Sequence, residues 1–270
     1  MGGRAERLYK PADLSDTIAF VQSLAPDEPI TWLGLGSNVL IRDNGIPGTV
    51  IITQNRLNGM EQINDTELRV EAGVACAKIA KLAIKLGLQG AEFFAGIPGT
   101  MGGALAMNAG AFGGETWENV IEVEVLTRDG IVITRTPTEY EISYRTVVGP
   151  QNEAFLAARL RFKKGDGAKA AEGVKALLQK RSETQPIGVP SGGSVFRNPP
   201  GDHAGRLVEA TGLKGFKIGG AQVSEKHANF IIQQGKATAA DIENLIKHVA
   251  EAVKATHNVT LETEVRILGV

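Results

Sequence analysis

The chain has 270 residues, of which 43% are hydrophobic and 22% are charged, and its formal net charge is -1. This is the composition of a globular protein of two or three domains, and the near-neutral charge excludes a general attraction to nucleic acid or to anionic membranes. The sequence contains no run of about 18 apolar residues, which is the length needed to span a membrane. Its single cysteine, Cys76, excludes an internal disulfide framework and fits a reducing cytoplasm.

The first segment predicts a mixture of helix and strand. Apolar residues at helical spacing predict a helix over 13–24, and short apolar runs predict strands over 30–33, 39–41 and 49–53. Asp43-Asn44-Gly45 is typical of a turn.

A second segment begins near Leu57 and ends at a linker, Gly165-Asp166-Gly167. It contains a predicted helix over 77–86, which Gly87 ends, and a long glycine-rich loop over 92–114. Cys76 is expected to be a small core residue rather than a reactive thiol. Strands are predicted over 67–71, 120–126, 131–135 and 155–162, the middle two forming a hairpin around Arg128-Asp129-Gly130.

The last segment again mixes helices and strands. Thr238 and Asp241 resemble a capping box at the start of a long helix. The helices are predicted over 168–180, 203–210 and 238–255, the strands over 228–233 and 261–268, and a loop over 185–200. The order of elements predicts an α+β fold with mixed sheets rather than a regular βαβ series.

Two glycine-rich loops are the candidates for chemistry. The first, Gly34-Leu35-Gly36-Ser37-Asn38, lacks the third glycine and the following helix of a dinucleotide-binding fingerprint. Its backbone N–H groups, with Ser37 and Asn38, can still form a concavity that binds phosphate. A plain tight turn explains these residues equally well.

The second loop, over 92–114, combines many glycines with almost no charge. It is too apolar for an exposed linker and too rich in glycine for a stable helix, except around Ala104. Backbone packed against a large, flat, partly apolar ligand explains both features. The alternative is a buried structural turn.

The chain resembles the UDP-N-acetylenolpyruvoylglucosamine reductases in motifs that span nearly its whole length. The motifs are Gly34-Leu35-Gly36-Ser37-Asn38-Val39-Leu40, Gly96-Ile97-Pro98-Gly99-Thr100, Asn108-Ala109-Gly110-Ala111, Ser143-Tyr144-Arg145, Gly193-Ser194-Val195-Phe196-Arg197-Asn198-Pro199 and Leu261-Glu262-Thr263-Glu264-Val265-Arg266. The resemblance implies an FAD-binding fold of the p-cresol methylhydroxylase/vanillyl-alcohol oxidase type, with two α+β subdomains, followed by a C-terminal α+β substrate-binding domain.

The resemblance also implies domain boundaries and an activity. The FAD-binding domain is expected over 1–164 (subdomains about 1–55 and 56–164), the substrate-binding domain over 165–260, and a final strand with a catalytic glutamate over 261–270. The implied reaction is the NADPH-dependent, FAD-mediated reduction of UDP-N-acetylglucosamine enolpyruvate to UDP-N-acetylmuramate. This reaction belongs to peptidoglycan synthesis, and hence to cell wall biogenesis, cell shape, the cell cycle and cell division.

Three catalytic side chains are implied. Hydride delivery leaves negative charge on the substrate carboxylate, which needs preorganised positive groups. Arg145 matches that role, and Glu264, in a protonated form, is expected to orient or polarise the same carboxylate. Ser194 matches the proton donor, although a serine hydroxyl is a weak acid and needs support from its neighbours. Without the resemblance, each would be interpreted as a surface charge or a turn residue.

Binding residues are implied in the same way. The expected FAD contacts are Gly34, Gly36, Ser37, Asn38, Gly96, Ile97, Pro98, Gly99, Thr100, Gly103, Asn108, Ala109 and Gly110. The expected substrate contacts are Arg197, Asn198, Lys217 and Lys226. His227 either joins the two lysines in a basic wall for the UDP phosphates or, with Asn229, hydrogen-bonds the loop itself. No metal site is indicated, and a cytoplasmic monomer without nucleic-acid or membrane partners is expected.

The chain departs from the family pattern at one end. Relatives begin earlier, whereas this sequence starts within the Gly2-Gly3 motif, through either a misplaced start or the loss of a strand. It also lacks a substrate-covering insertion and so resembles the shorter subtype. Two rival functions stay open: an FAD-dependent oxidase of a small alcohol or hydroxy acid, against which the Ser194 and Glu264 motifs argue, and a flavin-free regulatory module that binds a nucleotide-sugar.

Overall fold

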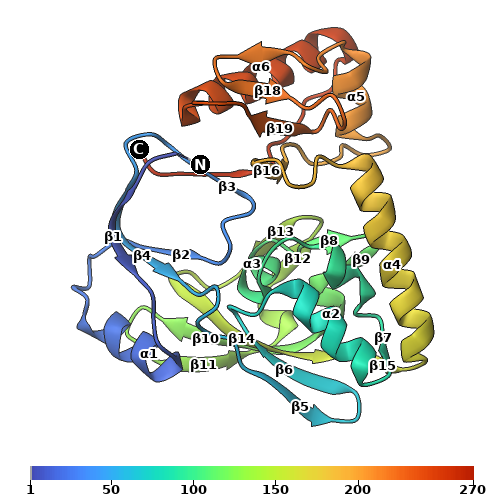
Figure 1. The fold of residues 1–270 in the computed structure, drawn as a ribbon. Coiled ribbons are helices and arrows are strands. Elements are labelled where there is room, and N and C mark those ends of the chain that lie inside the picture. The colour runs from blue at the N-terminus through green and yellow to red at the C-terminus, as the bar shows by residue number, and fades with distance from the viewer. Residues whose placement is uncertain (1) are drawn as a thin grey trace. The chain divides into compact units, whose positions relative to one another are not determined.

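The structure is a computed structural model and describes residues 2–270 (Figure 1). The chain divides into two compact units. The larger unit comprises Arg7–Gly36 and Gly48–Lys180. The smaller unit comprises Ser37–Pro47, Arg181–Val270 and the N-terminal residues up to Glu6. Both units mix helices with parallel and antiparallel strands, which confirms the predicted α+β class.

A small sheet has the strand order β1-β4-β2, and most of its residues belong to the larger unit. Its strands are β1 (Ala5–Tyr9), β2 (Ile30–Leu33) and β4 (Ile46–Ile52), and β2 pairs with β4 in parallel. Helix α1 (Leu14–Ser23) starts where the Asp13 side chain accepts a hydrogen bond from Asp16 N. The predicted helix over 13–24 and strand over 30–33 are confirmed, whereas the strand predicted from residue 49 starts earlier, at Ile46.

A five-stranded antiparallel sheet forms the centre of the larger unit, in the order β11-β10-β14-β6-β5. It contains β5 (Met60–Asn64), β6 (Glu67–Glu71), β10 (Val120–Thr127), β11 (Val132–Arg135) and β14 (Glu153–Arg161). The predicted hairpin is confirmed, because β10 pairs with β11. Strand β5 was not predicted, since its sequence, Met-Glu-Gln-Ile-Asn, has little apolar alternation.

Helices α2 (Cys76–Lys85) and α3 (Met101–Ala106) pack in one apolar core with Leu68, Val70, Val123 and Ala158 of this sheet. Cys76 lies in that core, and burial raises the pKa of its thiol to about 12, so it is the inert residue expected. The region predicted as a loop over 92–114 is partly ordered: it contains the 3-10 helix η1 (Glu92–Gly96), α3, β8 (Gly110–Ala111) and the start of β9 (Gly114–Glu115).

The remaining elements of the larger unit are short, apart from a long helix. Strand β7 (Leu88–Gln89) pairs with β15 (Lys163–Lys164), and β12 (Glu141–Ser143) forms a hairpin with β13 (Thr146–Val148). Two further 3-10 helices are η2 (Thr116–Asn119) and η3 (Pro137–Glu139). Helix α4 (Gly167–Thr184) begins at the predicted linker and extends beyond the predicted end at residue 180.

The smaller unit contains a four-stranded antiparallel sheet in the order β16-β19-β18-β17. The strands are β16 (Ser191–Ser194), β17 (Lys217–Ile218), β18 (Ala221–Val223) and β19 (Phe230–Gln233). Helices α5 (Ala204–Ala210) and α6 (Ala239–His257) contribute to its apolar core. Thr238 and Asp241 form the predicted capping box at the start of α6.

Two predictions for the smaller unit are wrong. The predicted loop over 185–200 contains β16. Its sequence, Ser-Gly-Gly-Ser, has no apolar residue that would indicate a strand. The predicted strand over 261–268 is limited to β20 (Arg266–Leu268), which pairs in parallel with β3 (Val39–Ile41). Glu262 and Glu264 therefore flank Thr263, which makes a single bridge to Phe196, and do not share one face of a regular strand.

Within residues 2–270, no helix is both long enough and apolar enough to cross a lipid bilayer.

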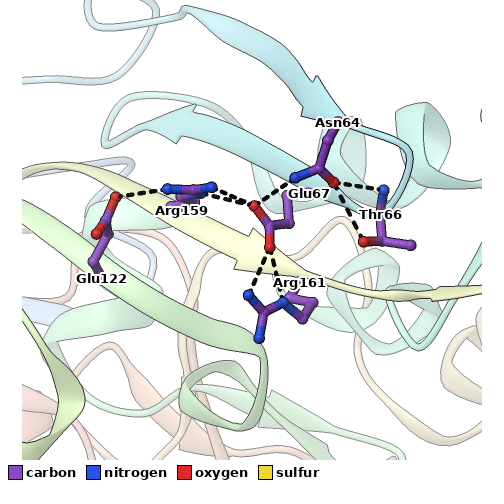
Figure 2. A network of polar contacts seen from close by, with 6 residues as sticks. All are labelled: Asn64, Thr66, Glu67, Glu122, Arg159 and Arg161. Carbon is purple, nitrogen blue, oxygen red and sulfur yellow. Dashed lines mark hydrogen bonds and ion pairs between the residues drawn. The ribbon is translucent and has the colours of Figure 1, made fainter.

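A charged ladder crosses the central sheet of the larger unit (Figure 2). Glu67 on β6 lies opposite Arg161 on β14, and its side chain is only 5% exposed. Its carboxylate accepts hydrogen bonds from Arg161 Nη2 at 2.7 Å and from Arg159 Nη2 at 2.6 Å. Asn64 Nδ2 donates a further bond at 2.8 Å. These donors hold the pKa of Glu67 below its usual value, and Arg161 contributes most.

The ladder predicts a pH-dependent loss of stability. Because the folded-state pKa of Glu67 is lowered, its stabilising contribution is complete above the unfolded value of about 4.3 and is lost as the pH falls through the folded value. We expect Glu67→Gln to lower the melting temperature near pH 7, and the difference from wild type to shrink as the medium becomes acidic. Glu61→Gln, which changes an exposed carboxylate on β5, is the control. A melting-temperature difference for Glu67→Gln that does not change with pH would contradict this account.

Candidate active site

The glycine-rich loop over 92–114 is held in place by backbone hydrogen bonds. Cys76 N donates to Gly99 O at 3.0 Å, Met101 N donates to Val74 O at 2.9 Å, and Gly102 N donates to Ala72 O at 2.9 Å. The first turn of α3 is therefore tied to the segment before α2. Gly96-Ile97-Pro98-Gly99-Thr100, predicted to contact FAD, leads directly into that first turn.

The two predicted FAD loops meet at Gly34 and Thr100 within the larger unit. A Cβ atom added at Gly34 would lie 2.1 Å from Thr100 Oγ1, so only glycine allows this approach. Thr100 Oγ1 is buried and has no hydrogen-bond partner among residues 2–270. A buried unsatisfied hydroxyl costs about 1–3 kcal/mol, which a ligand could offset. Gly36 has a φ of 71° and open space around it. An orphaned hydroxyl beside bare backbone fits a polar group of bound FAD.

The first glycine loop continues into the smaller unit, where three motifs meet. Asn38 Nδ2 donates to Glu264 O at 3.1 Å, and Arg266 N donates to Asn38 O at 3.0 Å. A Cβ atom added at Gly193 would lie 3.7 Å from Ser37 O. The predicted FAD residues Ser37 and Asn38 thus lie beside segments that carry predicted catalytic residues.

Ser194 and Glu264 are carried by neighbouring segments of the smaller unit. Ser194 ends β16, where it pairs with Phe230, and the next residue, Val195, accepts a hydrogen bond from Glu264 N at 2.7 Å. Both side chains are partly exposed. The structure therefore brings together these two residues, which are far apart in the sequence.

Arg145 lies at the turn between β12 and β13 and has a φ of 56°, which is unusual for a non-glycine residue. Its Nη2 donates to Gly110 O at 2.8 Å and its Nη1 donates to Asn108 O at 3.3 Å. The side chain is 15% exposed, and Cζ lies 4.8 Å from the centre of the Tyr144 ring. A predicted catalytic side chain therefore rests on the motif Asn108–Gly110, predicted to bind FAD.

The Asn108 side chain is engaged by the protein itself. Its Nδ2 donates to Glu115 Oε2 at 2.8 Å and to Ser143 O at 3.2 Å, while its Oδ1 accepts from Trp117 N at 3.1 Å. The Asn108 side chain thus holds the loop together through three hydrogen bonds. The sequence did not predict a role for Glu115. The only local sign that Glu115 lies close to Asn108 is the glycine-rich segment between the two residues.

The residues predicted to bind substrate lie in the smaller unit. Arg197 Nη1 is 3.6 Å from Glu262 Oε2, and Asn198 Oδ1 accepts a hydrogen bond from Ala204 N at 3.0 Å, at the start of α5. Lys217 and Lys226 line one cavity of about 460 Å³. Lys226 Nζ also donates to Ser182 O at 2.5 Å.

His227 and Asn229 hydrogen-bond within their own loop, as one of the two alternatives expected. Asn229 N donates to His227 Nδ1 at 3.2 Å, and the Asn229 amide exchanges two hydrogen bonds with the backbone of Phe196. Burial lowers the pKa of His227, which favours a neutral ring over a cationic one. The basic side of the cavity therefore consists of the two lysines.

A second cavity, of about 1070 Å³, lies in the larger unit. Phe93, Phe112 and Lys169 are among the residues on its walls. It contains none of the predicted FAD or catalytic residues, so the geometry does not assign it to the cofactor. Across residues 2–270, no group of three or more His, Cys, Asp or Glu side chains is placed to hold a metal ion.

Known proteins match the chain over nearly its whole length. Residues 5–136 match the FAD binding domain family, and residues 185–268 match the C-terminal domain of UDP-N-acetylenolpyruvoylglucosamine reductase. The reductase of that name from Alkalilimnicola ehrlichii is 57% identical over 99% of this chain and 90% of its own length. That from Coxiella burnetii is 54% identical over 100% of this chain and 91% of its own.

A solved structure extends the likeness to three dimensions. The crystal structure of UDP-N-acetylenolpyruvylglucosamine reductase (MurB) from Thermus caldophilus is 31% identical and has a TM-score of 0.81. It covers 97% of this chain, and the chain covers 91% of it. These matches confirm the fold implied by the sequence motifs.

The contact between Gly34 and Thr100 gives a prediction about stability. In the protein without added FAD, Gly34→Ala should destabilise by about 1–3 kcal/mol, because the new methyl group overpacks against a fixed hydroxyl. The double variant Gly34→Ala/Thr100→Ala should recover most of that loss, since Thr100 Cβ would lie 3.3 Å away. Gly103→Ala, whose added Cβ would lie 3.9 Å from Thr100 Oγ1, is the control in urea unfolding. A double variant as unstable as Gly34→Ala alone would refute the assigned contact.

Proposed function

The chain belongs to the UDP-N-acetylenolpyruvoylglucosamine reductase family, and from this premise we propose that Arg145, Ser194 and Glu264 carry out its chemistry. The protein is an FAD-dependent oxidoreductase that uses NADPH to reduce UDP-N-acetylglucosamine enolpyruvate to UDP-N-acetylmuramate, a reaction of peptidoglycan synthesis. Identity above 50% over the whole chain to reductases of this name carries the activity. The roles of the individual residues rest on the contacts described above.

FAD, when bound, supplies the hydride that reduces the carbon–carbon double bond of the substrate. The backbone of the two glycine loops and the Thr100 hydroxyl are the groups proposed to hold it. The remaining proposed contacts are Gly34, Gly36, Ser37, Asn38, Gly96, Ile97, Pro98, Gly99, Gly103, Asn108, Ala109 and Gly110. Thr100 Oγ1 supports this assignment most directly, because it is buried without a partner in the larger unit.

Arg145 is the proposed electrostatic stabiliser. Reduction of the double bond places negative charge on the conjugated carboxylate, and a guanidinium that is already in position stabilises this charge without reorganisation. Gly110 O and Asn108 O hold Arg145 from the protein side. Both contacts are made by N–H groups of the guanidinium, a planar fork of donors that suits a carboxylate.

Ser194 is the proposed proton donor to the carbon next to the carboxylate, and Glu264 is proposed to orient or polarise that carboxylate. Their segments are joined by the hydrogen bond from Glu264 N to Val195 O, which fixes the backbone positions of both. Gly193, the residue before Ser194, has a φ of 76° and no side chain. This backbone supports the approach of a substrate to the hydroxyl.

Substrate binding is proposed for the basic side of the smaller cavity. Lys217 and Lys226 line it and complement the charge of a diphosphate. Arg197 and Asn198 stay candidates for contacts with the sugar, although Asn198 Oδ1 also accepts a hydrogen bond from Ala204 N.

We further propose that the enzyme works as a cytoplasmic monomer in cell shape and cell division, with an FAD-binding part over 1–164 and a substrate-binding part over 165–260. The single buried cysteine supports a reducing compartment. The exposed large apolar side chains, such as Leu8, Phe112 and Ile131, are spread along the sequence over many elements, which supports a monomer.

The assignment of Ser194 predicts that one half-reaction fails while the other continues. Purified protein should be yellow, and NADPH should bleach Ser194→Ala as fast as wild type under anaerobic conditions. Return of the colour with the enolpyruvyl substrate should slow by at least about 100-fold, because general acid catalysis is lost. Ser191→Ala, on the same strand, is the control.

Each outcome of that assay separates the proposed function from its rivals. Normal reoxidation of Ser194→Ala by the substrate would show that another group donates the proton. An oxidase would be reduced by an alcohol or hydroxy acid and reoxidised by oxygen. A regulatory module would stay colourless even after incubation with FAD.

A further inference from the structure

Glu115 lies beside the guanidinium of Arg145. Its Oε1 is 3.6 Å from Arg145 Nη1, and its Oε2 accepts the hydrogen bond from Asn108 Nδ2 at 2.8 Å. In the short hairpin of β8 and β9, Glu115 pairs with Gly110, whose carbonyl accepts from Arg145 Nη2. Glu115 therefore contacts Arg145 and also both residues whose carbonyls hold it, Asn108 and Gly110.

The Glu115 carboxylate is itself held in position. Glu115 is the N-cap of η2, and its side chain accepts a hydrogen bond from the backbone of Glu118. The Glu118 side chain in turn accepts from Glu115 N at 3.1 Å, which completes a capping box. The Glu115 side chain is 30% exposed, so solvent competes only partly for this carboxylate.

From these contacts we propose that Glu115 is a positioning residue that acts on the substrate through Arg145. This inference rests on the proposed role of Arg145. The two carbonyls fix where the guanidinium sits, while the carboxylate favours one orientation of it and also holds the amide of Asn108. Removing Glu115 loosens Arg145 both directly and through Asn108. The guanidinium is then less accurately positioned toward the negative charge on the substrate.

The size of the effect follows from the two contacts. A partly exposed ion pair at 3.6 Å contributes little by itself, whereas a hydrogen bond to a charged group contributes more. We expect Glu115→Ala to slow reoxidation of the reduced flavin by the enolpyruvyl substrate about tenfold, the loss of one such bond. Glu115→Gln keeps an acceptor for Asn108 and should fall between Glu115→Ala and wild type. Reduction by NADPH should be unchanged in both.

A matched control separates positioning from stability. Glu118→Ala removes the acceptor for Glu115 N but removes no contact with Arg145. We expect it to lower the melting temperature about as much as Glu115→Ala does and to leave both half-reactions at wild-type rates. Substrate half-reactions that slow equally in Glu115→Ala and Glu118→Ala would mean that loss of the cap explains the effect, and would overturn the proposal.

A double-mutant cycle tests whether Glu115 acts through Arg145. In the Arg145→Ala background, Glu115→Ala should cause no further slowing of the substrate half-reaction, because its target is gone. Multiplicative effects of the two substitutions, or no effect of Glu115→Ala in the wild-type background, would overturn the positioning role and leave the proposed function intact. If Arg145→Ala alone leaves the substrate half-reaction unchanged, the proposed function of Arg145 fails first.

Discussion

The geometry of the candidate site depends on one buried amide. Asn108 is 2% exposed, has a φ of 43°, and hydrogen-bonds through both ends of its side chain. Its Nδ2 holds Ser143 O, so the hairpin that carries Arg145 is tied to the glycine loop. Its backbone carbonyl then accepts from the arginine itself. Asparagine adopts the left-handed region more readily than most non-glycine residues. Asn108 therefore turns the chain through its backbone and stabilises the turn through its side-chain hydrogen bonds.

A second constraint acts through the absence of a side chain. Gly34 passes so close to Thr100 that no Cβ fits, and the threonine hydroxyl there has no partner among the described residues. Folded proteins rarely leave such a group unsatisfied, so its persistence points to a ligand. In the smaller unit, Asn38 hydrogen-bonds to the backbone of Glu264. The first glycine loop thus contributes residues to both compact units, and each unit is made of more than one stretch of the chain.

Local signals predicted much of the fold, and long-range contacts set the limit. Residues 13–24 show helical spacing of apolar residues, residues 238–255 begin with a capping box, and residues 120–135 show a hairpin pattern. These elements formed as expected. One strand was predicted over 261–268, yet its partner changes along the segment: Thr263 makes a single bridge to Phe196, and only Arg266–Leu268 pair regularly, with β3. Strand formation needs a continuous neighbour as well as a suitable sequence. Arg145 and Gly110 meet across 35 positions, and no spacing rule reveals that contact. The family motifs identified Arg145 but not Glu115, whose only local sign is a glycine-rich neighbourhood.

The protein uses the pairing of arginine with glutamate in two different ways. In the charged ladder, Arg159 and Arg161 approach Glu67 to 2.6 and 2.7 Å, and each donates two hydrogen bonds to the carboxylate of a side chain that is 5% exposed. Such pairs satisfy their own charges and stabilise the sheet. Arg145 is held by two carbonyls, Gly110 O at 2.8 Å and Asn108 O at 3.3 Å, and the carboxylate oxygen of Glu115 lies farther away, at 3.6 Å. A neutral carbonyl positions a guanidinium without cancelling its charge, and the proposed role of Arg145 depends on this kind of preorganisation.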